Sequence, residues 1–177
     1  IASGEEGQGG NATYECCTFR GSLVALSAST GAVVWKTYTI PNESKPIGRN
    51  NSGTVRWGPS GAGVWSSPTV DVKRRVVYAA TGNMYTDPQQ TTSDAILAFD
   101  MESGKVVWAA QATTNDIFLV GCNGNPPTGA NCPKDAAGPD FDFGNAPILA
   151  KLPNGRDAIV IGQKSGVGWA FDPDKQG

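Results

Sequence analysis

The sequence contains no histidine among its 177 residues. This absence excludes serine–histidine–aspartate and cysteine–histidine nucleophiles, ordinary zinc sites and the Cys-x-x-Cys-His haem attachment within these residues. Acid–base chemistry in this chain therefore has to come from aspartate or glutamate.

Charge and long apolar runs are also scarce. Charged residues make up 17% of the chain, the formal net charge is -2 and no basic cluster occurs, which argues against a nucleic-acid partner. No run of about 18 apolar residues is present, so we expect no transmembrane segment. The sequence has no signal peptide and both its ends interrupt a pattern, so we expect residues 1–177 to be a fragment of a larger domain.

The chain has four cysteines. Cys122 and Cys132 bracket a loop rich in glycine, proline and asparagine, and they are expected to pair as a staple of that loop. The adjacent Cys16 and Cys17 then either join each other or each cross to the other pair. An even number of cysteines in loops favours an oxidising compartment, so we expect a periplasmic or secreted bacterial protein.

Glycine and proline are abundant, at 23 and 12 residues, which suits many short strands joined by turns. Three segments are alike: each has a strand of alternating apolar residues and a polar turn that ends in glycine, and the first two continue into a second strand that ends in tryptophan. They span residues 21–35, 93–108 and 168–177.

The turn glycines Gly31, Gly104 and Gly177 are each 73 residues from the next. A repeated hairpin with a terminal tryptophan is typical of propeller blades, in which the tryptophan wedges between neighbours and the glycine supplies a positive φ. The sequence therefore predicts an all-β fold, about two to three blades of a propeller. So few blades cannot close a ring, so other sequence or other chains would supply the remaining blades.

Two segments between the predicted strands are long, residues 37–63 and 115–144. A blade normally needs about 40–45 residues, so these segments hold the excess. Loops of this length in a compact domain are usually functional.

Residues 65–85 organise the rest of the chain. We predict a strand over residues 67–71, a polar turn at 73–75 and a second strand over 76–80. Gly82 then frees the backbone so that Asn83 can point its amide oxygen into a pocket. With the flat ring of Trp65, this oxygen suits a planar cofactor and a hard cation. The alternative is a plain hairpin with a core tryptophan and a turn asparagine.

One pattern carries a family resemblance. Asp-x-x-Ser-Gly-Lys-x-x-Trp at residues 100–108, joined to Tyr-Ala-Ala-Thr-Gly-Asn at 78–83, resembles the quinoprotein alcohol dehydrogenases. These are eight-bladed propellers that hold pyrroloquinoline quinone (PQQ) and calcium. Residues 16–21 look most like the polyvinyl alcohol branch of that family. The resemblance implies an enzyme that oxidises alcohols, including secondary or polymeric ones, and passes electrons to a cytochrome c.

The resemblance also implies roles for residues near the N-terminus and after the hairpin. Ser3, Gly4 and Glu5 match the segment that wraps the edge of PQQ, and Glu6 at its end matches a calcium ligand. A solvated acidic turn is the alternative for this segment. Asn83 matches the asparagine that coordinates calcium.

The remaining implied roles concern the redox chemistry. Trp65 matches the floor under the quinone ring, and Lys164 matches the basic residue that hydrogen-bonds the quinone oxygens. Asp116 follows a repeat strand as the family's catalytic aspartate does, so it is the expected base for the alcohol proton and, with Glu6 and Asn83, an expected residue of the metal site. Phe118 stands where lanthanide-dependent relatives carry a further aspartate, which favours calcium.

One departure and two rival functions remain. Cys16 and Cys17 follow Glu6 by ten residues, whereas the family's adjacent cysteines come well before the calcium glutamate, so an equal role is not assumed.

The main rival is a non-catalytic PQQ-repeat propeller that serves as an assembly scaffold or binding platform. A second is a calcium-stabilised lectin or hydrolase that uses Asp140 and Asp142, although their alternation with phenylalanine indicates more simply the edge of a loop.

Overall fold

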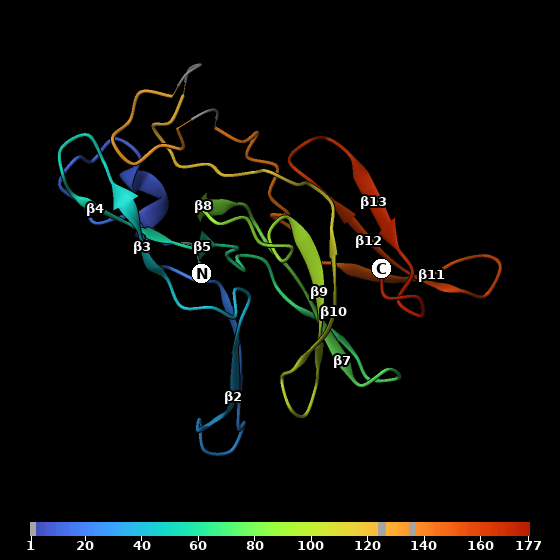
Figure 1. The fold of residues 1–177 in the computed structure, drawn as a ribbon. Coiled ribbons are helices and arrows are strands. Elements are labelled where there is room, and N and C mark those ends of the chain that lie inside the picture. The colour runs from blue at the N-terminus through green and yellow to red at the C-terminus, as the bar shows by residue number, and fades with distance from the viewer. Residues whose placement is uncertain (1–2, 124–126, 135–136) are drawn as a thin grey trace.

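The computed structural model describes residues 3–123, 127–134 and 137–177 (Figure 1). The described chain folds into separate antiparallel sheets, and its one helical element is the short 3-10 helix η1 (Gly4–Gln8). No helix in this part of the chain is long and apolar enough to cross a membrane. The predicted all-β class is confirmed.

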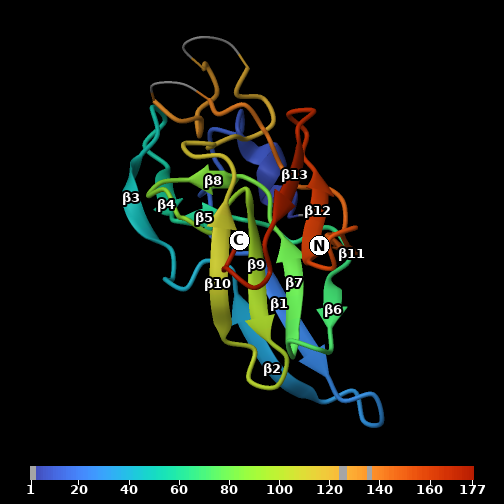
Figure 2. The ribbon, with the colours of Figure 1, turned by 90° about the vertical axis from the view of Figure 1, so that its right-hand side faces the viewer.

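The central blade is a four-stranded sheet in the order β10-β9-β7-β6, which Figure 2 shows side by side. Its strands are β6 (Thr69–Asp71), β7 (Val76–Ala80), β9 (Ala95–Asp100) and β10 (Val106–Gln111). The hairpin predicted within residues 65–85 is present, with a shorter first strand than expected.

Strand β9 is buried on both faces, because neighbouring sheets cover the central blade on both sides. Ile96 on one face packs in a cluster that includes Ile159 from the next sheet. Leu97 on the opposite face packs in a cluster that Leu23 of the preceding sheet joins. The apolar run of this strand therefore reflects its central place between layers.

The flanking sheets are incomplete relative to the central blade. One has three strands, β11 (Ile148–Lys151), β12 (Asp157–Gly162) and β13 (Gly168–Phe171). The other has two, β1 (Ser22–Leu26) and β2 (Val33–Tyr38), and it projects from the body in Figure 1. The described chain is thus a partial propeller of two to three blades.

The repeat glycines and tryptophans meet across the blades. Gly104 has φ 70°, and a Cβ there would lie 2.5 Å from the ring of Trp35. The indole Nε1 of Trp35 donates to the Met101 carbonyl at 3.1 Å. In the next repeat Trp108 lies against Gly177, which has φ 108°. The tryptophan of each blade therefore packs on the turn glycine of the next, as the repeat predicts.

The segment over residues 37–63 was predicted as a loop, and this prediction is wrong in part. It contains the hairpin of β3 (Lys45–Arg49) and β4 (Val55–Gly58), and β5 (Ser60–Gly61) pairs with β8 (Met84–Thr86). The Asn50 side chain accepts hydrogen bonds from the backbone of Ser52 and Thr54, which builds the turn.

All four cysteines are in disulfides. Cys122 pairs with Cys132, as predicted, and Cys16 pairs with its neighbour Cys17 rather than crossing to the other pair. Both disulfides lie in one buried cluster with Tyr85 and Leu119.

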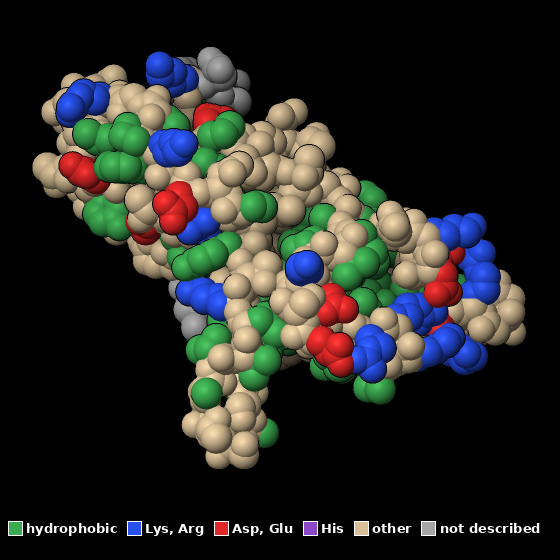
Figure 3. Space-filling model, turned by 60° about the horizontal axis from the view of Figure 1, so that its bottom comes forward, with side chains coloured by type: hydrophobic (Ala, Val, Ile, Leu, Met, Phe, Trp, Pro, Cys, Tyr) green, Lys and Arg blue, Asp and Glu red, His purple; other side chains and the backbone are tan. Residues whose placement is uncertain are grey.

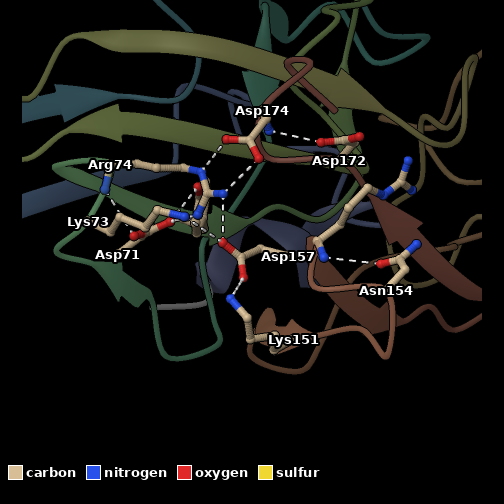
Figure 4. Close-up of polar contacts among 10 residues, drawn as sticks. Asp71, Lys73, Arg74, Lys151, Asn154, Asp157, Asp172 and Asp174 are labelled. Atoms are coloured by element: carbon tan, nitrogen blue, oxygen red, sulfur yellow. Dashed lines mark hydrogen bonds and ion pairs between the residues drawn. The ribbon is translucent and has the colours of Figure 1, made fainter.

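An ionic cluster joins the central blade to the next one at their outer ends (Figure 4). The guanidinium of Arg74 forms ion pairs with Asp71 at 2.8 Å, with Asp157 at 2.8 Å and with Asp174 at 2.8 Å. Figure 3 shows charged side chains of both signs gathered at one end of the molecule. Because Asp157 begins β12 and Asp174 follows β13, Arg74 holds two blades together.

Candidate functional site

A cavity of about 190 Å³ gathers side chains from widely separated parts of the chain. The lining comes from η1, the segment before β6, the link from β7 to β8, strand β8, the loop before β11 and the loop after β12. The lining residues are Glu6, Gly63, Trp65, Gly82, Asn83, Tyr85, Asp142 and Lys164. Four predicted site residues, Glu6, Trp65, Asn83 and Lys164, thus lie around one space.

Asn83 is buried at the end of the β7 hairpin, and its side chain is held in one orientation. Its amide Nδ2 donates to the Met84 carbonyl at 2.6 Å and to the Phe118 carbonyl at 2.8 Å. Two carbonyl acceptors identify this atom as the nitrogen. No hydrogen bond to Oδ1 forms among the described residues, so this oxygen is available as a neutral metal ligand.

Asp142 lines this cavity, although the sequence-based assignment left it out of the dehydrogenase site and named it only for the rival lectin or hydrolase. It is 3% exposed, its Oδ1 accepts from the Asn83 backbone N–H at 2.7 Å, and its Oδ2 accepts from Lys164 Nζ at 2.6 Å. Phe143, the next residue, is buried in the core with Phe171. Because neighbouring residues of an extended chain point in opposite directions, the buried phenylalanine directs Asp142 into the cavity. The alternation of aspartate and phenylalanine was the available signal.

The indole of Trp65 and the carboxylate of Asp142 each lie against a glycine, at a position where a side chain would not fit. A Cβ at Gly144 would lie 2.7 Å from the indole ring, and a Cβ at Gly82 would lie 2.3 Å from Asp142 Oδ1. The indole is 44% exposed, and the Lys164 Nζ lies 5.3 Å from the centroid of its ring. An aromatic face and a cation therefore border the same open space.

Three carboxylates lie together at the cavity, two of them in its lining, and they outnumber the one neighbouring cation, Lys164. Oxygen atoms of Glu6, Asp140 and Asp142 all lie within 4.8 Å of one another. Burial raises the pKa of the Glu6 carboxyl, and Asp142 and Asp140 raise it further. Burial also raises the pKa of Asp140. A set of oxygen donors with excess negative charge fits a hard cation such as calcium.

Lys164 makes two ion pairs within this cluster. Its Nζ lies 2.9 Å from Asp140 Oδ1 and 2.6 Å from Asp142 Oδ2. Burial lowers its pKa, but hydrogen bonds to Asp142 and Asp140 outweigh burial and raise the pKa above its ordinary value. Lys164 therefore stays cationic at neutral pH.

Asp116 is fully buried and does not line the cavity. Its Oδ1 accepts from the Asp140 backbone N–H at 3.0 Å, and its Oδ2 accepts from the Phe141 N–H at 2.7 Å. Burial raises the pKa of the Asp116 carboxyl, and Asp142 adds to the increase. Asp116 thus lies behind the wall of the cavity and positions the loop that presents Asp140 and Asp142.

The structure does not bring Ser3, Gly4 or Glu5 into the cavity lining. Ser3 caps η1 by accepting from the Glu5 N–H at 3.1 Å. The Glu5 carboxylate accepts from the backbone N–H groups of Thr18 at 2.8 Å and Phe19 at 2.6 Å. These contacts anchor η1 to the chain after the Cys16–Cys17 disulfide, and in doing so they place Glu6.

Comparison with known proteins finds a family match over most of the chain. Residues 7–128 match the PQQ family model described as glucose/ethanol/alcohol dehydrogenase, beta-propeller domain. The whole chain is 50% identical to a polyvinylalcohol dehydrogenase from a Pseudomonas species and 44% identical to one from Sphingopyxis sp. (strain 113P3). The chain spans 27% of the length of each of these relatives.

A solved structure shows the same fold at lower sequence identity. The quinohemoprotein alcohol dehydrogenase ADHIIG from Pseudomonas putida HK5 matches 94% of this chain with a TM-score of 0.58 and 22% identity. The match covers 24% of that protein. The arrangement of blades in this chain is therefore one that a solved propeller also has.

Proposed function

Because this chain belongs to the PQQ family of glucose/ethanol/alcohol dehydrogenase β-propellers, we propose that it forms part of a dehydrogenase that oxidises alcohols with PQQ and calcium. The observation that carries this proposal is the meeting of Glu6, Asn83, Asp142 and Lys164 beside Trp65 in one cavity. The proposed electron acceptor is a cytochrome c, and the proposed location is the periplasm or the exterior of a bacterium.

Calcium would be held by the Glu6 carboxylate and the Asn83 Oδ1, with Asp140 and Asp142 beside it. These groups are the oxygen ligands that calcium prefers. Burial raises the pKa of Glu6, Asp142 and Asp140 raise it further, and a bound cation would favour the ionised form of this carboxyl.

PQQ would lie against the exposed face of Trp65. Gly144 packs directly against the indole ring, and Lys164 borders the same space as a fixed cation. When bound, PQQ supplies the redox chemistry and calcium acts as a Lewis acid. Lys164 would hydrogen-bond the oxygens of the cofactor and favour negative charge there.

Asp142 is our proposed acceptor of the alcohol proton, in place of Asp116. Asp142 lines the cavity, whereas both oxygens of Asp116 accept backbone hydrogen bonds behind it. Oδ2 of Asp142 lies 2.6 Å from the Lys164 ammonium, which holds this carboxylate in place beside the cavity. Asp116 would act as a positioning residue for the loop.

The substrate we propose is a secondary alcohol group of a polymer. The 50% and 44% identical relatives are named polyvinylalcohol dehydrogenases, and each match covers this whole chain. The rival function, a non-catalytic scaffold, would not need a cluster of three carboxylates beside an exposed tryptophan.

Reconstitution separates the enzyme from the scaffold. The full-length protein would be incubated with PQQ and calcium, and the absorbance spectrum of the bound cofactor and alcohol-dependent dye reduction would be measured. We expect stoichiometric PQQ binding that requires calcium and that Glu6→Gln weakens. Full-length protein that is folded but binds neither PQQ nor calcium would contradict the proposed function.

A further inference from the structure

The proposed calcium ligand Glu6 lies on an element that has little stability of its own. The 3-10 helix η1 has five residues, and helices this short are marginal without contacts from outside. The Glu5 carboxylate anchors one side of η1 through backbone N–H groups at residues 18 and 19. The place of the Glu6 carboxylate in the cavity therefore depends on what holds the rest of the helix.

The end of η1 is held by a second segment, the part of the chain next to the Cys122–Cys132 disulfide. The Val120 backbone N–H donates to the Glu6 carbonyl at 2.8 Å. The Asn131 backbone N–H donates to the Gly9 carbonyl at 2.9 Å. The last carbonyls of a helix have no partners within it, so these two donors complete η1 from outside.

The side chain of Asn131 adds further bonds between the two segments. It is fully buried, and its Nδ2 donates to the carbonyls of Gln8 and Asn11, each at 2.9 Å. Its Oδ1 accepts from Asn50 Nδ2 at 3.2 Å. A buried amide whose nitrogen and oxygen both have partners is held in one orientation. Asn131 therefore fixes the chain on both sides of Gly9.

Gly9 allows the two segments to touch. It is buried, and a Cβ there would lie 2.6 Å from the Val120 carbonyl oxygen and 2.8 Å from Cys122 Sγ. A Cβ at Gly7, within η1, would meet nothing among the described residues within 4 Å. The contact at Gly9 leaves no room for a side chain, so adding one there has to move η1 or the segment beside it.

We propose that Asn131 and the close contact at Gly9 position Glu6 as a ligand of the metal. This inference rests on the proposed calcium site. Neither Asn131 nor Gly9 lines the cavity, so both would act through the placement of η1. Replacing a residue that orients a metal ligand typically weakens metal binding by about 10–100-fold.

Calorimetric titration of the full-length protein with calcium, in excess PQQ, tests this role. Asn131→Asp keeps the size but turns an oxygen toward the Gln8 and Asn11 carbonyls. We expect calcium affinity to fall by about 10–100-fold, and excess calcium to restore the absorbance spectrum of bound PQQ. Gly9→Ala should weaken calcium binding in the same way, and it provides a second test if Asn131→Asp does not fold. Gly7→Ala, the matched control, should bind calcium as the wild type does.

Tyr78→Phe separates positioning from a general loss of stability. It removes a buried hydrogen bond to Asp71 in the central blade, so it should lower the unfolding temperature and leave calcium affinity unchanged. Calcium affinity equal to that of the wild type in folded Asn131→Asp and Gly9→Ala would overturn the inference and leave the proposed function standing. A wild-type protein that binds no calcium would contradict the proposed function, and this inference with it.

Discussion

The Nζ of Lys164 lies 2.6 Å from Oδ2 of Asp142, and the two residues come from different loops, one before β11 and one after β12. The same carboxylate accepts the Asn83 backbone N–H through its other oxygen. Asp142 therefore connects the lysine that would face the cofactor to the asparagine that would face the metal. This arrangement fixes the orientation of the Asp142 carboxylate within the cavity.

Removing the lysine should disturb the site more than the fold. Lys164→Met leaves three neighbouring carboxylates without their cation, so we expect weaker PQQ binding and a rate of alcohol oxidation lower by about 10²-fold. Lys105→Met, at an exposed turn, is the matched control and should leave both unchanged. The measurements are PQQ titration and dye reduction by the full-length protein. Equal PQQ affinity and rate in the two variants would remove Lys164 from the site.

Asp94 should make stability fall as the pH rises. Both its carboxyl oxygens are buried without a partner, and burial, with Asp116 and other carboxylates adding, raises its pKa to about 9. A carboxyl whose pKa is higher in the folded state binds a proton on folding. Its contribution to the free energy of unfolding is therefore complete below about pH 4, the pKa of the unfolded state, and is lost as the pH rises to about 9. Asp94→Asn should therefore gain stability relative to the wild type by on the order of 1 kcal/mol per pH unit over this window.

Urea denaturation at pH 5 and pH 8 measures this difference. Asp100→Asn is the control, because hydrogen bonds from Ser103 lower the pKa of Asp100 below its ordinary value. Asp100 is therefore ionised at both pH values, and the stability that Asp100→Asn loses should be the same at pH 5 and pH 8. A difference between Asp94→Asn and wild type that is the same at both pH values would show that Asp94 holds no extra proton.

Arg74 should contribute far more to stability than its neighbour Arg75. The Arg74 side chain is 12% exposed and pairs with the buried Asp71, so Arg74→Met leaves that carboxylate without its cation and should cost about 3 kcal/mol. Arg75 pairs with Glu102 on the exposed surface, and Arg75→Met should cost less than about 1 kcal/mol. Chemical denaturation of both variants gives the comparison, and equal losses would contradict the role of Arg74 between the blades.

The contact between Trp35 and Gly104 gives a further test of blade packing. Gly31 and Gly104 have nearly equal φ, 71° and 70°, but a Cβ at Gly31 meets nothing within 4 Å. Gly31→Ala should therefore cost only the backbone strain of about 1–2 kcal/mol, and Gly104→Ala should cost more because it displaces the Trp35 ring. Thermal unfolding of the two variants measures the difference, and a Gly104→Ala loss no greater than that of Gly31→Ala would contradict the packing.

Much of the fold could be predicted from local pattern. The even spacing of Gly31, Gly104 and Gly177 indicated the blades, since each turn requires a positive φ. The β3–β4 hairpin was missed because its turn depends on side-chain hydrogen bonds of Asn50 that leave little trace in apolar periodicity.

The site was harder to predict than the fold. Glu6, Trp65, Asn83 and Lys164 were recognised individually, and the structure brings them together. The choice between Asp116 and Asp142 depends on which carboxylate faces the cavity, and that orientation is set by Phe143 in the core and by backbone donors at residues 140 and 141. These contacts join positions that are 24 and 25 residues apart, which a single sequence does not reveal.

The assignment of Asp142 as the proton acceptor is the central claim, and one comparison tests it most directly. The rate of dye reduction with alcohol would be measured for Asp142→Asn and Asp116→Asn in the full-length protein, each with PQQ and calcium shown to be bound. We expect Asp142→Asn to lower the rate by about 10²–10⁴-fold, since an amide cannot accept the proton. Asp116→Asn should retain a larger part of the rate, because its carboxylate only positions the loop. A normal rate for cofactor-loaded Asp142→Asn, with the loss confined to Asp116→Asn, would contradict this account.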